Sequence, residues 1–270
     1  MPVDTLSLAG KTAIITGSGR ENGIGAAIAT AFARNGASVA IHYVSEGSKG
    51  KAEKVAAGLT KDFGVKTTVV QGSVDNYSTA KRIVEETLKA FGIAHIDILV
   101  NNGIVTNPVQ SLTEVAQKDL EKEFSVNVFG TIYMTQAVVG AGAMPIGGRI
   151  INIGSIVSKL NSPPFIYSAA KAAQDSLTAA WASELGRSHG ITVNTLAPGP
   201  MPTDSSKPFL QNPDGSPSGL AQAVIQQGRA ANRLGTVQDM ADAALLLVSE
   251  KSRWITAQWI SVSGGVTGTS

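Results

Sequence analysis

Short apolar runs rich in β-branched residues alternate with longer helical patterns along the whole of this chain. Strands are expected over 12–16, 38–43, 66–71, 96–100, 149–153, 191–196 and 260–262. Helices are expected over 25–35, 48–63, 78–91, 114–139, 167–185 and 237–249. Strands that alternate with helices pair in parallel and carry helices on both faces. The pattern therefore predicts an α/β fold with a doubly wound parallel sheet.

The length of 270 residues fits one large α/β domain or two small ones. A stretch rich in Pro, Ser, Gly and Asp, roughly 198–219, interrupts the alternation. As a linker between domains it would leave too little chain after it for a second core. A long loop inside a compact domain is usually a functional lid or partly disordered. We expect a single domain over 1–270, with a substrate loop at about 200–220.

Composition excludes several classes of function. Hydrophobic residues make up 43% and charged residues 16%, and the net charge of +2 is spread over mixed signs. This balance gives no electrostatic case for a nucleic-acid or membrane partner. Cysteine is absent, which excludes disulfides and suits a reducing compartment. No secretory signal or apolar run of about 20 residues is visible, so we expect a cytoplasmic protein.

A glycine-rich turn lies between the first expected strand and the first expected helix. Glycines in such a turn let backbone amides approach a pyrophosphate, and the helix N-terminus adds a favourable dipole. Tight turns also collect glycine, so the position after the first strand carries the interpretation. The turn predicts a Rossmann-like dinucleotide site that includes Gly17, Gly19, Arg20, Asn22, Gly23 and Ile24.

The end of the second strand bears on the choice of cofactor. An NAD site usually places Asp or Glu there to hold the ribose 2′-hydroxyl, but no acid follows before Glu46. Arg20 could pair with a 2′-phosphate instead, helped by Ser45 and the backbone of His42 and Tyr43. In the alternative, Arg20 is solvated and Glu46 reaches the ribose. We favour NADPH/NADP+ over NADH.

Tyr167 and Lys171 lie four residues apart on an expected helix, and Ser155 stands twelve residues before Tyr167. Residues with this spacing share one helix face. An ammonium there can lower the pKa of a phenol from its usual value of about 10. Such a phenol can act as a proton donor and acceptor near neutral pH. Alone, the pair also fits a buried phenol beside a solvated lysine.

Together these motifs resemble the short-chain dehydrogenase/reductase family, in its common form of roughly 250 residues. The resemblance runs from about Leu8 to the C-terminus and includes Asn101-Asn102-Gly103 and Pro198-Gly199. It implies that Ser155, Tyr167, Lys171 and Asn127 are the catalytic residues, with Lys171 on the nicotinamide ribose and Asn127 holding a water. It adds to the implied cofactor contacts Tyr167, Lys171, Ser73, Val74, Asn101, Gly103, Pro198, Gly199, Met201 and Thr203.

Three departures from the family pattern concern the cofactor site. Five residues separate Gly17 from Gly23, where the family usually has three. The fourth-strand motif reads Asn-Asn-Gly-Ile, as though an Ala were deleted. Ser73 stands where many members have an Asp that contacts adenine. None of the three touches the residues of proton transfer, so the catalytic interpretation is unchanged.

The resemblance is strongest to NADPH-dependent ketoreductases of the 3-oxoacyl-carrier-protein and fungal polyketide or naphthol type. It implies reduction of a small-molecule ketone to a secondary alcohol in a homotetramer formed through the long helices. The apolar stretch 163–166 and Phe209-Leu210 suggest a moderately hydrophobic carbonyl substrate. An NAD-linked alcohol or steroid dehydrogenase and a non-catalytic dinucleotide-binding protein are the alternatives. The three histidines show no ligand spacing, so no metal site is expected.

Overall fold

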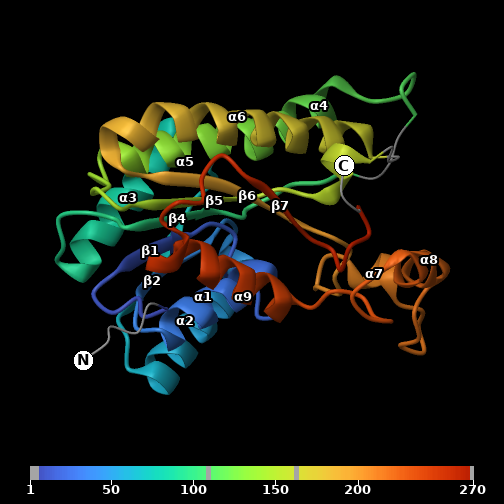
Figure 1. Cartoon of the computed structure of the whole chain (residues 1–270), viewed down its shortest axis with the longest axis horizontal. Helices are drawn as coiled ribbons and strands as arrows, with labels where there is room; N and C mark the ends of the chain where they lie inside the picture. The colour runs from blue at the N-terminus through green and yellow to red at the C-terminus, as the bar shows by residue number, and fades with distance from the viewer. Residues whose placement is uncertain (1–5, 108–110, 161–163, 268–270) are drawn as a thin grey trace.

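One sheet of seven parallel strands runs through the molecule, in a computed structural model that describes residues 6–107, 111–160 and 164–267 (Figure 1). The strand order is β3-β2-β1-β4-β5-β6-β7, and every neighbouring pair is parallel. The strands are β1 (Thr12–Ile15), β2 (Ser38–Tyr43), β3 (Thr67–Gln71), β4 (Ile98–Asn101), β5 (Arg149–Ile153), β6 (Thr192–Pro198) and β7 (Trp259–Val262). The predicted α/β doubly wound fold is confirmed.

Helices cover both faces of the sheet (Figure 1). One layer holds α1 (Ile24–Arg34), α2 (Lys49–Phe63) and α9 (Val237–Val248). The opposite layer holds α3 (Tyr77–Phe91), α4 (Gln117–Phe124), α5 (Gly130–Val139) and α6 (Phe165–His189). Short 3-10 turns, η1 (Glu46–Ser48), η3 (Ile156–Lys159) and η4 (Glu250–Ser252), follow β2, β5 and α9.

The two helix layers enclose two separate hydrophobic cores. Successive residues of a strand point to opposite faces, so Ile14 packs in the core under α3, α5 and α6, and Ile15 in the core under α1, α2 and α9. Ile150 and Ile151 of β5 divide in the same way. Strands buried on both faces need continuous apolar runs, which is why these runs stood out in the sequence.

Most predicted elements agree with the observed ones to within a few residues, but the helix predicted over 114–139 is interrupted. Between α4 and α5 the backbone forms a π-helical turn, η2 (Ser125–Phe129). Single π turns inside helices occur frequently at functional sites, because the widened turn redirects one side chain. Asn127 lies at its centre and is fully buried.

The predicted loop over 198–219 contains the short helix α7 (Lys207–Leu210) and is followed by α8 (Gly219–Gln227), which the sequence analysis did not predict. The Ser218 side chain caps α8 by accepting a hydrogen bond from the Ala221 N–H at 3.2 Å. A bridge between Gln211 and Pro217 closes the intervening turn. Figure 1 shows α7 and α8 beside the two helix layers. They lie beyond the end of the sheet at which the chain leaves β6.

A bilayer-spanning segment would need a long apolar helix. Within the part of the chain that the structure describes, no helix combines the required length and hydropathy.

Candidate active site

The site lies where the strand order of the sheet reverses direction. From β1 the chain proceeds to β2 on one side, whereas β4 and the later strands pair on the other. In doubly wound sheets, ligands bind in the crevice at the carboxyl ends of the two strands beside this reversal. Here the glycine turn leaves β1 and Asn102-Gly103 leaves β4, so both predicted motifs meet at that crevice.

The glycine turn is packed too tightly for side chains at two positions. A Cβ on Gly17, which has φ +65°, would lie 2.9 Å from the Cα of Gly103. A Cβ on Gly25 would lie 2.9 Å from the Cα of Ser18 and 2.6 Å from the Nδ2 of Asn102. The same Asn102 Nδ2 donates hydrogen bonds to the carbonyls of Thr16 at 2.8 Å and Gly17 at 3.2 Å. Asn102, which belongs to the predicted motif but not to the predicted cofactor contacts, therefore joins β4 to the turn.

The predicted cofactor residue His42 forms hydrogen bonds to the backbone of the glycine turn. Its Nδ1 accepts a hydrogen bond from the Gly17 N–H at 2.9 Å, so its Nε2 carries the proton, which faces the Gly72 carbonyl at 2.7 Å. The His42 carbonyl also accepts from the N–H groups of Ser18 and Gly19. Burial lowers the pKa of His42 from 6.5 to about 4, so the imidazole is neutral. Both ring nitrogens thus form hydrogen bonds to backbone groups around the turn.

The helix that follows the turn offers its N-terminus to an anion. Gly23 is the N-cap of α1 and provides no side-chain cap, and the first turn, which begins at Ile24, contains no acidic residue. The partial positive charge of the helix end is therefore not neutralised by the helix itself. A helix N-terminus behind a glycine turn suits the pyrophosphate of a dinucleotide. The residues present fit such a cofactor.

Arg20 points toward the predicted substrate loop. Its exposed guanidinium donates to the Ser205 hydroxyl at 2.7 Å, and the Asn22 carbonyl accepts from the Asp204 N–H at 3.3 Å. Ser45, expected beside a 2′-phosphate, pairs its hydroxyl with that of Ser48 at 2.8 Å. The base of the loop is thus attached to the glycine turn, and the hydrogen bonds of Arg20 and Ser45 go to different partners.

Several other predicted cofactor residues lie around the same crevice, in structural roles. Tyr43 and Ala52 crowd Gly19, where an added Cβ would lie 3.2 and 2.9 Å from their Cβ atoms. Val74 packs on Gly130, and Ser73 donates to Asp75, which helps to lower the pKa of that carboxyl.

Asn101 turns away from the turn into a buried polar network. Its Nδ2 donates to Asn152 Oδ1 at 2.9 Å and to Thr135 at 3.1 Å, and Asn152 donates to Thr178 at 2.8 Å. The network connects β4, β5 and α6, and it places the amide of Asn101 behind the sheet edge. Gly103 stays at the crevice, where its N–H donates to the Thr16 hydroxyl at 2.8 Å.

The segment that follows β6 brings four more predicted residues to the site. Pro198 ends the strand, and the Gly199 N–H donates to the Val262 carbonyl of β7 at 3.2 Å. Met201 is buried, and its carbonyl accepts a hydrogen bond from the Ser206 hydroxyl. Thr203 is bonded to the same hydroxyl through its N–H at 2.8 Å.

Ser155, Tyr167 and Lys171 come together as the sequence predicts. Ser155 follows β5 and caps η3, and its hydroxyl is hydrogen-bonded to the phenol of Tyr167 in the first turn of α6. Lys171 is fully buried one turn further along, with its Nζ 5.5 Å from the centroid of the Tyr167 ring. The three side chains therefore converge at the carboxyl end of β5, next to the crevice.

The pKa of Tyr167 is shifted opposite to the direction expected from its spacing to Lys171. Burial of the phenol raises its pKa, with a smaller contribution from the charge of Glu123, and the Ser155 hydrogen bond opposes the rise. The Lys171 Nζ donates to the Ile153 carbonyl at 2.6 Å and to Gln174 Oε1 at 2.8 Å. Burial lowers the pKa of Lys171 itself to about 7.

Asn127 is joined to Lys171 through residues that the sequence analysis missed. Gln174, which accepts from Lys171, donates to the Thr131 hydroxyl at 2.6 Å, and that hydroxyl donates to the Asn127 carbonyl at 2.9 Å. The Asn127 side chain holds Val105, accepting from its N–H at 2.9 Å and donating to its carbonyl at 2.7 Å. Only the position of Gln174, three residues after Lys171, could have suggested this chain of contacts.

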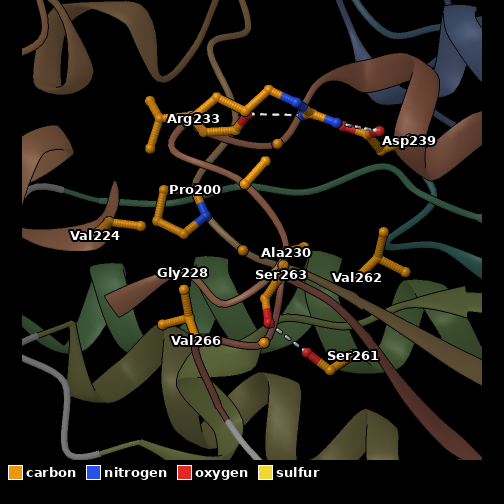
Figure 2. A pocket seen from close by; sticks show the side chains of 16 residues that line it. Pro200, Val224, Gly228, Ala230, Arg233, Asp239, Ser261, Val262, Ser263 and Val266 are labelled. Carbon is orange, nitrogen blue, oxygen red and sulfur yellow. Dashed lines mark hydrogen bonds and ion pairs between the residues drawn. The ribbon is translucent and has the colours of Figure 1, made fainter. Parts of the chain in front are cut away.

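A cavity of about 380 Å³ opens beside the end of β6, between the chain after α8 and the chain after β7 (Figure 2). Pro200, Val224, Val262 and Val266 give it an apolar lining. Figure 2 shows Arg233 at one side, where its guanidinium binds Asp239 at 2.7 and 3.0 Å. Within the described residues no cluster of three or more His, Cys, Asp or Glu is arranged to hold a metal ion.

This edge of the sheet has the chemistry of an oxidoreductase that works with a dinucleotide, and comparisons with known proteins agree. A family profile described as enoyl-(acyl carrier protein) reductase matches residues 17–267. The short-chain dehydrogenase/reductase FrzI of a Cladobotryum species is 36% identical, over 96% of this chain and 97% of FrzI. The hydroxynaphthalene reductase-like protein Arp2 of Metarhizium guizhouense is 31% identical, over 96% of each chain.

Solved structures give the same result. A blue fluorescent protein from a metagenomic library, in complex with NADPH, is 32% identical with a TM-score of 0.85, over 96% of this chain and 99% of that one. A short-chain dehydrogenase from Burkholderia cenocepacia, in complex with NADP, is 32% identical with a TM-score of 0.84, over 97% and 99%. The chain belongs to the short-chain dehydrogenase/reductase family and is an oxidoreductase, as the sequence predicted.

The neutral state of His42 leads to a prediction about stability. Its pKa of about 4 lies below the ordinary 6.5, so between these values the unfolded chain binds a proton that the folded chain does not. Unfolding free energy should therefore fall as the pH drops from about 6.5 to 4, by up to about 3 kcal/mol. In His42→Asn, chemical denaturation across this range should show a correspondingly smaller fall.

The exposed His189 provides the matched control. His189→Asn should retain the full pH dependence of the wild type. Equal slopes for wild type and His42→Asn would show that His42 does not stay neutral in the folded chain.

Proposed function

We propose that this enzyme reduces a ketone to a secondary alcohol with NADPH, with Tyr167 as the proton donor. The observation that carries the proposal is the hydrogen bond between Ser155 and a phenol whose pKa is raised by burial. A phenol in this state holds its proton at neutral pH, which suits donation to a carbonyl oxygen. In the reverse reaction, the oxidation of an alcohol, the same group would act as the proton acceptor, and the NADPH preference proposed below is what favours reduction.

The chemistry divides between the cofactor and the chain. NADPH, when bound, supplies the hydride to the carbonyl carbon. Ser155 hydrogen-bonds the carbonyl oxygen and orients it, and Tyr167 donates its proton as negative charge grows on that oxygen. Lys171, with a pKa of about 7, is buried beside the phenol and can exchange a proton near neutral pH. The contacts through Gln174 and Thr131 hold the ammonium in place.

NADPH is proposed over NADH on two grounds. The end of β2 carries no carboxylate that would repel a 2′-phosphate, and the Ser45 and Ser48 hydroxyls lie together there. The two solved relatives were determined with NADPH and NADP. Arg20, exposed on the glycine turn, supplies the positive charge for the phosphate in this proposal.

The proposed substrate is a moderately hydrophobic carbonyl compound. Ile156 is buried directly after Ser155, and Phe165 and Ile166 precede Tyr167. Phe209 of α7 is 69% exposed, on the loop after β6 that the sequence analysis assigned to the substrate. The expected lining residues 108–110 and 161–163 lie outside the described residues.

Replacing the proposed proton donor tests the function. Tyr167→Phe should lower kcat for ketone reduction by about 10²- to 10⁴-fold, since the acid is removed while the ring is kept. NADPH oxidation would be followed with acetoacetyl thioesters, aryl ketones, polycyclic quinones and an enoyl thioester. NADPH binding, measured by fluorescence, should be unchanged.

Tyr77→Phe, at an exposed tyrosine, is the control and should retain full activity. If only the enoyl thioester were reduced, the substrate of the enzyme would be a conjugated alkene and not a ketone. Tight NADPH binding without turnover of any compound would favour the non-catalytic alternative.

A second experiment tests the cofactor preference. Arg20→Ala should raise the Kd for NADPH about tenfold or more and leave that for NADH nearly unchanged, because only NADPH has a 2′-phosphate. Ser205→Ala is the matched control, because it removes the hydrogen-bond partner of Arg20 in the loop and keeps the charge of the Arg20 guanidinium. If Arg20→Ala raised the Kd values for NADPH and NADH equally, Arg20 would act by holding the loop and not by binding the 2′-phosphate.

We also propose a cytoplasmic homotetramer that assembles through α5 and α6. The outer face of α6 exposes the small residues Ala169, Ala172, Ala179 and Ala180, which allow close packing of helices. Sedimentation should give a tetramer for the wild type and smaller species for Ala172→Glu. A monomeric wild type would contradict the assembly.

A further inference from the structure

Glu123, in the last turn of α4, is a buried carboxyl that the mechanism above does not use. The residue is 2% exposed, and its Oε1 accepts a hydrogen bond from the Asn107 N–H at 2.9 Å. Its Oε2 is also buried and has no hydrogen-bond partner of good geometry among the described residues, although the Asn107 side chain also contributes a hydrogen bond to the carboxyl. Burial raises the pKa of Glu123, and the nearby charge of Asp119 adds to the rise. One oxygen therefore lacks a donor in a place that water does not reach freely.

The position of Glu123 is tied to the catalytic residues. It lies one helical turn before Asn127, and the two side chains hold the same loop, Glu123 at Asn107 and Asn127 at Val105. The loop is the one that leaves β4 beside the glycine turn. α4 packs against α6, and the charge of Glu123 contributes to the raised pKa of Tyr167. The carboxyl therefore lies near enough to the proton donor for its charge to act on the phenol.

Holding the loop does not account for a carboxylate. The backbone and the side chain of Asn107 both donate to the carboxyl, and a neutral amide would supply an acceptor oxygen for them equally well. A buried charge without enough partners is costly. Lys171, the buried cation of the site, is turned to Ile153 and Gln174. A donor from outside the chain would complete the second oxygen.

We infer that Oε2 of Glu123 accepts a hydrogen bond from the substrate, so that the enzyme prefers ketones that carry a hydroxyl or an ammonium group near the carbonyl. The inference rests on the proposed reduction of ketones and narrows the substrate class. Glu123 is thereby a specificity-determining residue on the substrate side of Tyr167. An uncharged hydrophobic ketone would bind with the carboxyl still unsatisfied.

The test compares matched ketones in matched variants. The substrates are 1-tetralone and 1-tetralones with a hydroxyl or an aminomethyl group at successive ring positions. The variants are Glu123→Gln, which keeps an oxygen for Asn107, and Glu123→Leu, which removes both oxygens. Glu121→Gln, at an exposed carboxyl on the same helix, is the control. The readout is the ratio of kcat/KM between each substituted ketone and 1-tetralone, with NADPH saturating.

In the wild type and in Glu121→Gln, the best donor-bearing ketone should exceed 1-tetralone about tenfold or more, as expected for a hydrogen bond to a buried charge. In Glu123→Leu the ratio should fall to near one. Glu123→Gln separates the two donors, because an amide oxygen still accepts from a hydroxyl but does not balance an ammonium charge. Loss of an aminomethyl preference alone assigns an ammonium, and a retained hydroxyl preference assigns a hydroxyl.

Two results would overturn the inference. One is a wild type without preference for any donor-bearing ketone. The other is a loss of rate in Glu123→Leu that is equal for all ketones, which would mean that Glu123 only positions the loop.

Failure of the proposed reduction is distinguished by a binding measurement. If no tetralone is reduced, the corresponding alcohols are titrated calorimetrically into the protein saturated with NADP+. Tighter binding of a donor-bearing alcohol in the wild type, lost in Glu123→Leu, sustains the subsite without the ketone reaction. Equal binding of all alcohols to the wild type and to Glu123→Leu would rule out the proposed subsite as well.

Discussion

Parallel pairing of all seven strands is the constraint from which the site follows. Because the strands share one direction, the glycine turn after β1, Asn102 after β4 and Ser155 after β5 all emerge at the same edge. A parallel sheet also needs helices to return the chain, and these helices bring Tyr167, Lys171 and Asn127 to that edge from one layer. Cofactor and proton-transfer residues therefore meet although more than a hundred residues separate them in sequence.

Burial then sets the chemistry of the residues that meet there. Lys171 is fully enclosed, and its ammonium is satisfied by a strand carbonyl and by Gln174. Tyr167 is half-buried and has its pKa raised, while His42 is kept neutral beneath the glycine turn. The desolvation that disfavours charge on these groups is also what keeps the phenol protonated, as its proposed role as a proton donor requires.

The sequence predicted the layers, most element bounds and the meeting of Ser155, Tyr167 and Lys171, because these depend on hydrophobic periodicity and local spacing. It did not predict the π turn around Asn127, whose cause is packing rather than propensity. Its prediction that His42 and Asn101 contact the cofactor stays a prediction, and it did not foresee that their side chains bond to the protein backbone and to a buried network. The contact of Glu123, in the last turn of α4, with Asn107, in the loop after β4, joins two residues whose spacing in the sequence follows no period.

The tight packing of the glycine turn restricts how this site can change in evolution. A Cβ at Gly25 would meet Asn102 Nδ2, and a Cβ at Gly17 would meet the backbone of Gly103, the residue after Asn102. Neither glycine can therefore acquire a side chain unless the segment after β4 moves in the same step. Substitutions at these positions are therefore expected to be epistatic with changes in the segment after β4.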